Sequence, residues 1–125
     1  MADQSQSDAR ATMAQEMQRT AFLKKAVSAK PVNDTLDDAI AFFKERGYRA
    51  GRTGRPNQIF VMGGREGALP RVNAEILAQG NVGKGKTTML TISGFGERLH
   101  AELQAYIAYL VEQRKEIRQR QREQR

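Results

Sequence analysis

Two runs of alternating apolar and polar residues flank a segment rich in glycine and lysine, and they limit the fold more than any other feature. Apolar residues occupy every second position from Val72 to Ala78, and again at Leu90 and Ile92. A period of two is typical of a strand with one buried and one solvated face. Residues 69–79 and 87–93 are therefore predicted to be strands, joined by a hairpin loop over residues 80–86.

The same loop matches a phosphate-binding pattern. Residues 80–87 read GNVGKGKT, which satisfies G-x-x-x-x-G-K-[ST]. A working P-loop joins a buried strand of a parallel sheet to the N-terminus of a helix. Here a strand is expected to follow Thr87, so the pattern is interpreted as a hairpin tip. Its Lys84 and Lys86 are candidate anion contacts, and nucleotide binding at residues 80–87 stays the third of three functional hypotheses.

Two more strands are predicted before this hairpin. Residues 48–53 form a short basic segment that is expected at a sheet edge, and residues 58–62 form the most apolar segment, which is expected at the centre. Turn-forming residues at 54–57 separate them. The four strands follow one another with short connections, which favours pairing between neighbours in the chain.

Helices are predicted on both sides of these strands. Thr35 and Asp38 have capping-box spacing at the start of a helix over residues 35–46, and Gly47 follows its end. A strong apolar stripe from Leu99 to Leu110 predicts a helix over residues 97–111. The fold class is therefore α+β, a four-stranded antiparallel β-meander packed by helices on one face. The predicted single domain covers residues 35–111 and is completed by helix 97–111.

The two ends of the chain are predicted to lie partly outside this domain. Residues 1–7 are expected to be disordered, and residues 8–30 a semi-independent N-terminal helix that Pro31 ends. Its apolar stripe is thin and rich in alanine. Residues 112–125 continue the long C-terminal helix as a projecting basic tail, in which Ile117 is the only apolar residue.

Composition excludes several kinds of chemistry. The chain has 125 residues and no cysteine, which removes disulfides, thiolate metal sites and cysteine nucleophiles. His100 is the only histidine, so no metal is expected, and no cofactor is implied. No nucleophile–base pair follows from the spacing of other residues, which makes an enzyme less favoured than a binding protein. The N-terminus lacks the pattern of a signal peptide, and a cytoplasmic protein is expected.

The leading functional hypothesis is a non-enzymatic interaction module. Two helices that are longer or less apolar than one small core requires indicate assembly with a protein partner or with a second copy. The candidate partner-binding residues are Met13, Met17, Phe22 and Ile117.

The alternative is a protein that binds RNA or DNA. The formal net charge is +7, and arginines gather around the first predicted strands and the C-terminal tail. Interleaved aromatic residues, which RNA-binding sheets use for stacking, are missing. The candidate polyanion-binding residues are Arg49, Arg52, Arg55, Arg65, Arg71, Lys84, Lys86, Arg114 and Arg118.

Overall fold

A computed structural model describes residues 2–82 and 87–124. Over these ranges the chain forms three helices and five strands, and the last four strands follow one another without a helix between them. In chain order they are α1 (Ala2–Arg19), β1 (Phe22–Ser28), α2 (Val32–Glu45), β2 (Arg49–Arg52), β3 (Gln58–Gly63), β4 (Val72–Val82), β5 (Thr87–Phe95) and α3 (Glu97–Glu123).

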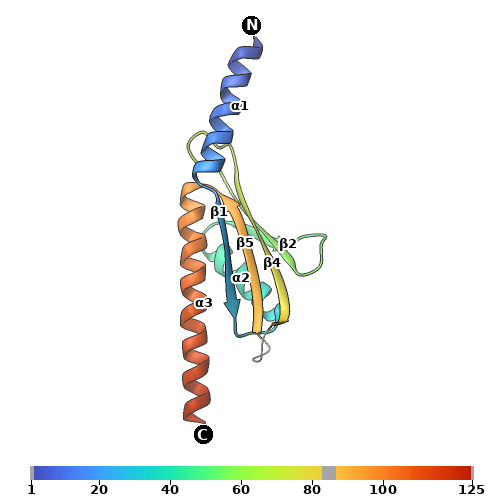
Figure 1. Cartoon of the computed structure of the whole chain (residues 1–125), viewed down its shortest axis with the longest axis vertical. Coiled ribbons are helices and arrows are strands. Elements are labelled where there is room, and N and C mark those ends of the chain that lie inside the picture. Colours follow the sequence, from blue (N-terminus) through green and yellow to red (C-terminus); the bar gives the residue numbers. More distant parts are fainter. Residues whose placement is uncertain (1, 83–86, 125) are drawn as a thin grey trace.

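The strands form one antiparallel sheet in the order β1-β5-β4-β3-β2. Helix α3 packs over β1 and β5, and α2 packs over β2, β3 and β4. Both helices cover the same face, and α1 extends from one end of the molecule (Figure 1). The α+β class is confirmed, but the prediction of four strands missed β1. The edge position expected for residues 48–53 is confirmed, whereas the central strand is β4 and not β3.

Strand β1 replaces the second half of the predicted N-terminal helix. The helix ends at Arg19, and the residues from Phe22 to Ser28 pair with β5. Phe22, Ala26 and Ser28 are buried at alternate positions, at 3%, 8% and 1% exposed. Burial of one strand face under α3 outweighs the helical preference of an alanine- and lysine-rich segment. Helix α1 also begins earlier than expected, at Ala2, where the sequence predicts disorder over residues 1–7.

Helix α2 begins at Val32, three residues before the predicted capping box. Pro31 is its N-cap and does not end a preceding helix. Thr35 therefore belongs to the first turns of α2 and is not its N-cap. Its hydroxyl donates to Ser28 Oγ at 2.9 Å and to the Lys30 carbonyl at 3.1 Å. The Thr88 hydroxyl donates to the same carbonyl at 2.7 Å. This buried cluster joins the end of β1 to α2 and β5.

The core fills the space between the sheet and the two helices that cover it. Alternate residues of the strands point into the core. This agrees with the period of two from which residues 69–79 and 87–93 were predicted to be strands. Gly94 permits the close approach of β5 to β4, because an added Cβ would lie 2.5 Å from the Ala74 Cβ. The largest fully buried side chains are Tyr106, Phe43, Leu36, Ile59, Leu69, Ile76, Leu90, Ile92, Leu99, Leu103, Leu110 and Val61.

Helix α3 is a single helix of 27 residues that continues well past the predicted domain boundary at residue 111. Its Arg114 guanidinium donates to the Val27 carbonyl, so the basic segment still contacts β1 at this point. The two chain ends point in opposite directions along the long axis (Figure 1). None of the helices in the described residues is long and apolar enough to span a bilayer.

A matched pair of substitutions distinguishes strand β1 from the helix that the sequence predicts. Phe22 is buried, whereas its neighbour Leu23 is 73% exposed on the other side of the strand. Phe22→Ala is expected to lower the free energy of unfolding by about 3–5 kcal/mol. Leu23→Ala is expected to change it by about 0.5 kcal/mol or less in the monomer. Urea denaturation measures both, and similar losses for the two variants would contradict the strand.

Candidate functional site

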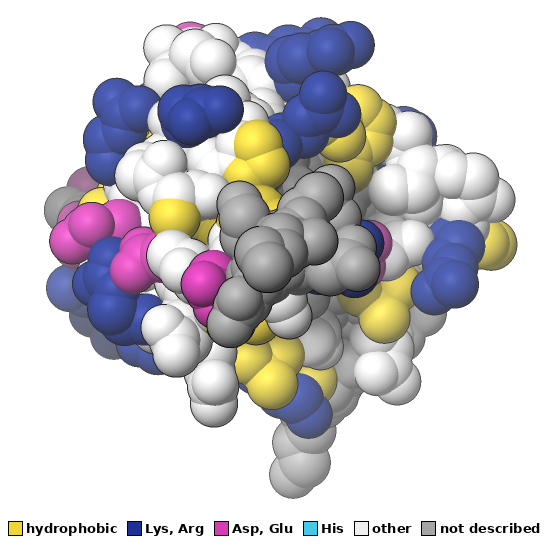
Figure 2. Space-filling model, turned by 90° about the horizontal axis from the view of Figure 1, so that it is seen from above, with side chains coloured by type: hydrophobic (Ala, Val, Ile, Leu, Met, Phe, Trp, Pro, Cys, Tyr) yellow, Lys and Arg dark blue, Asp and Glu magenta, His cyan; other side chains and the backbone are white. Residues whose placement is uncertain are grey.

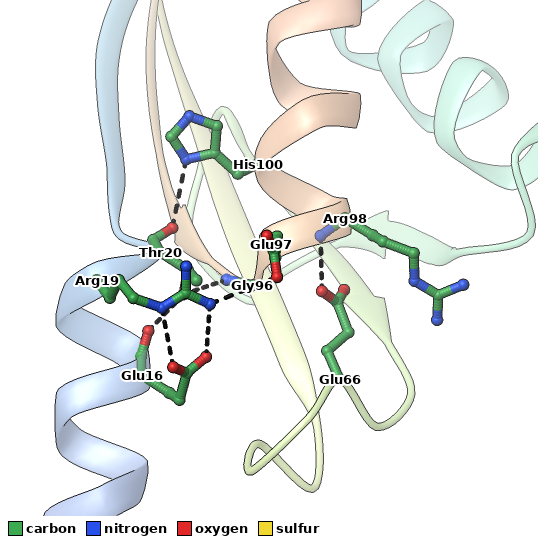
Figure 3. A network of polar contacts seen from close by, with 8 residues as sticks. All are labelled: Glu16, Arg19, Thr20, Glu66, Gly96, Glu97, Arg98 and His100. Carbon is green, nitrogen blue, oxygen red and sulfur yellow. Dashed lines mark hydrogen bonds and ion pairs between the residues drawn. The ribbon is translucent and has the colours of Figure 1, made fainter.

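The base of α1 is fixed to the start of α3 by a polar network (Figure 3). The buried Thr20 hydroxyl accepts the Gly96 N–H at 2.9 Å and donates to the Glu16 carbonyl at 2.6 Å. Arg19 donates to Glu16 at 2.9 Å and reaches Glu97 at 3.4 Å. These ion pairs are exposed, so the buried threonine contributes more to the anchor than they do. The hydrogen bond from Arg19 also lowers the pKa of Glu16.

The same network caps α3. Gly96 is the N-cap residue and has a φ of 121°, which favours glycine, and no side chain of its own caps the helix. The Glu66 carboxylate from the β3–β4 loop instead accepts the Arg98 N–H at 2.7 Å. A carboxylate at this position also interacts favourably with the helix dipole. The cap therefore comes from a residue 32 positions away in sequence.

His100 lies beside this network on the first turns of α3. Its Nδ1 is 3.5 Å from the Thr20 carbonyl, and its ring meets Phe22 edge-on at 5.1 Å between centroids. Gln104 Nε2 lies 3.2 Å from its other ring nitrogen. The described residues contain no group of three His, Cys, Asp or Glu side chains that could hold a metal ion. His100 thus has a packing role at the joint between the terminal helices.

The rest of α1 leaves the domain. It has no extensive contact with any other described helix or strand. From residue 7 to residue 19 its side chains are exposed, except that Met13 and Glu16 are half-buried. Met17 is 40% exposed. Helix α1 therefore presents Met13 and Met17 outside the core.

The candidate partner-binding residues do not form one surface. Phe22 is only 3% exposed and belongs to the core, so it is not part of a surface with the other candidates. Ile117 lies near the far end of β1, where it lines a hollow with Ala29, Thr87 and the basic residues Arg114 and Arg118. Helix α1 is at the opposite end of the molecule (Figure 1).

The candidate polyanion-binding residues are divided among several places. Arg49 and Arg71 line one hollow at the end of the sheet where β4 begins, and Arg65 lines a second with Arg98. Arg52 lies at the other end of β2 and pairs with Asp37 at 2.9 Å. Arg55 is exposed in the β2–β3 turn, and Arg114 and Arg118 lie on α3. Lys84 and Lys86 lie outside the described residues.

The view down the long axis agrees with this division. Lys and Arg side chains lie on several sides of the molecule, separated by uncharged surface, and most of the visible acidic side chains lie on the left (Figure 2). No single basic face is visible in this view.

The phosphate-loop pattern lies on an antiparallel hairpin. Gly80 belongs to β4, and Val82 pairs with Thr87 at the start of β5. A strand therefore stands where a P-loop requires the N-terminus of a helix. The hairpin predicted from the alternation is confirmed by this pairing.

A buried aromatic group joins α2 to α3. The rings of Phe42 and Tyr106 meet at 5.2 Å, and the Tyr109 hydroxyl donates to Asp38 at 2.7 Å. Gln113 also donates to this carboxylate, at 2.9 Å. Burial and the hydrogen bond to Asp38 raise the pKa of Tyr109 to about 12. Burial also raises the pKa of Tyr106, whose hydroxyl has no partner among the described residues.

The face of the sheet opposite the helices holds residues that sequence reasoning did not select. Leu23 and Leu77 are 73% and 48% exposed there. Leu77 is an apolar residue at a position where the alternation requires a polar one, and this was the available signal. Leu23 could not be found in the same way, because its segment was read as a helix.

Comparison with protein-family models, curated proteins and solved structures found no match.

Substitution of the half-buried Tyr109 and of the fully buried Tyr106 is expected to have opposite effects. At neutral pH, Tyr109→Phe should lower the free energy of unfolding by about 1–2 kcal/mol, because a charged acceptor loses a donor. Tyr106→Phe removes a hydroxyl that has no described partner, and stability should stay equal or rise. Because the folded pKa of Tyr109 is raised to about 12, its contribution is fully present below pH ~10. It is lost as the pH rises toward 12.

Denaturant unfolding of the wild type and of Tyr109→Phe between neutral and strongly alkaline pH measures this contribution. The two stabilities should converge at the alkaline end. A constant difference across the series would contradict the assignment.

Proposed function

We propose that this protein is a non-enzymatic interaction module that binds a protein partner through α1. One observation carries the proposal: an 18-residue helix stands outside the domain while its base is anchored to it. The anchor sets the direction of the helix, and the remaining length is free to contact another molecule.

The physical argument concerns the stability of α1. Isolated helices of about this length are marginal in water, because most helix stability in proteins comes from packing. Since α1 has no extensive contact with the other helices and strands that the structure describes, its packing partner is expected to be another molecule. Met13 and Met17 are four residues apart and share one face. Methionine adapts to irregular apolar grooves, which suits a helix-in-groove contact.

Ile117 supports a second, smaller contact at the other end of the molecule. It is half-buried beside Ala29, and charged side chains surround it. Its distance from α1 favours an extended partner or two partners over one compact interface.

Charge substitutions on α1 test the proposal. Met13→Lys with Met17→Lys should abolish partner binding, because two charges would enter an apolar contact. Ala11→Lys with Gln15→Lys adds the same charge on the opposite face and should leave binding intact. A photo-crosslinking residue at position 17, introduced in the cells that make the protein, should give discrete crosslinked species. The same residue at position 15 should give none, and absence of crosslinks from both positions would contradict a partner on α1.

Nucleic-acid binding is the second candidate. One observation favours it: Arg49, Arg71 and Arg98 lie near one end of the sheet, and no carboxylate among the described residues pairs with any of them. Arg49 and Arg71 also share a hollow. Guanidinium groups without carboxylate partners are available for phosphates.

The salt dependence of binding tests this candidate. Arg49→Ser with Arg71→Ser should weaken binding to single-stranded RNA and lower the slope of log affinity against log salt by about 1–2. Arg52→Ser is the control, since Arg52 already pairs with Asp37. Fluorescence anisotropy measures both variants. Failure of the wild type to bind at low salt would eliminate this function.

A further inference from the structure

None of the helices that the structure describes covers the second face of the sheet (Figure 1). We call it the open face, defined by the outward residues of β1, β5, β4 and β3. Apolar side chains cross it diagonally, and each is at least partly exposed. Cross-strand and diagonal neighbours on a sheet face lie within reach of one another. In order across the sheet, this diagonal consists of Val27, Met89, Leu77, Phe60 and Met62.

Both edges of the sheet are protected against pairing with a strand of another molecule, whereas the open face is uncovered. Edge strand β1 carries Lys24 and Lys25 in its middle, and the Arg114 guanidinium donates a hydrogen bond to the Val27 carbonyl. The other edge strand, β2, has only four residues and begins and ends with Arg49 and Arg52. Short strands and charged side chains prevent addition of another strand. A partner of the sheet therefore has to approach the face and not the edge.

Four residues on the open face have a self-complementary arrangement. Leu23 aligns with Ser93 and Glu75 across the strands, and Lys25 aligns with Thr91 and Leu77 in the next outward row. The two leucines and the two opposite charges thus occupy the corners of a patch roughly 10 Å by 7 Å. The leucines stand at opposite corners, and Lys25 and Glu75 stand at the other two.

A two-fold axis along the leucine diagonal satisfies all four residues at once. Each leucine meets its own symmetry copy, and Lys25 of one molecule comes within about 4 Å of the position opposite Glu75 of the other, a distance that its long side chain can span. An interface with such an axis uses the same patch on both molecules. From this geometry we infer that the open face binds a second copy of the chain, sheet against sheet. This inference does not depend on α1.

The size of the face is sufficient for a specific dimer. Four strands about 4.8 Å apart and four outward rows about 6.8 Å apart give roughly 500 Å² on each copy. The total of about 1,000 Å² reaches the lower limit for specific interfaces. Packing of two sheets through interdigitated side chains is a common arrangement in β-sandwiches. A dimer of this size is expected to be reversible and to dissociate on dilution.

Charge exchange between Lys25 and Glu75 is the decisive experiment. Lys25→Glu and Glu75→Lys each place like charges opposite one another and should weaken dimerisation at least about tenfold. The double variant restores opposite charges and should recover most of the wild-type affinity. Sedimentation equilibrium of the full chain measures the dissociation constants. Within one molecule these residues stand two strands apart, so recovery in the double variant reports a contact between molecules.

Leu77→Lys separates this interface from binding by α1. It should make the chain monomeric, whereas Met17→Lys should leave the dimer unchanged, because α1 lies beyond the end of the sheet (Figure 1). Circular dichroism verifies that Leu77→Lys is folded, as expected for a side chain that is 48% exposed. A wild-type monomer at high concentration would overturn the inference. A dimer that persists in Leu77→Lys, or a double charge variant that stays monomeric, would also overturn it.

Discussion

The pairing of β1 with β5 is the contact on which the rest of the structure depends. It joins the first strand of the sheet to the last, so the segments before and after the domain emerge next to one another. Phe22 pairs with Gly94, and two residues further the Thr20 hydroxyl binds the Gly96 amide. Without this pairing α3 would lose one of the strands it covers, and α1 would lose its anchor. The close approach of β5 to β4 at Gly94 belongs to the same arrangement.

Local sequence patterns predicted the strands in the middle of the chain, but they failed for β1 near its beginning. The four later strands follow one another through short turns, so alternation, glycine and proline identify them within short windows. Strand β1 pairs with residues about seventy positions away, and no local signal records that pairing. Its Ala26 and its two lysines favour helix by intrinsic propensity, and only burial of Phe22 under α3 reverses this preference. The same limit explains Pro31, which was read as the end of one helix and is the N-cap of the next.

The candidate sites depend even more on tertiary contacts. A charge count cannot show that Arg52 pairs with Asp37 while Arg49 and Arg71 have no carboxylate partner in residues 2–82 and 87–124, because these pairings depend on how α2 crosses the sheet. The glycine–lysine loop was correctly read as a hairpin, since its flanks showed the period of two that a P-loop helix lacks. Leu77 is the exception to that alternation, because it is an apolar residue at a position where a polar one is expected. It belongs to the apolar diagonal of the open face, and contiguous exposed apolar residues mark interaction surfaces, whereas single ones do not.

The two surfaces proposed here differ in the assemblies that they can form. A face-to-face contact with a two-fold axis closes at two copies, because each open face is used once. Helix α1 projects along the long axis and leaves the open face uncovered, so it stays accessible when two sheets meet (Figure 1). Thr20 and Gly96 fix the base of α1 to the sheet that dimerises. The dimer therefore carries two α1 helices in a defined relative orientation, and a partner with two matching grooves gains affinity from both.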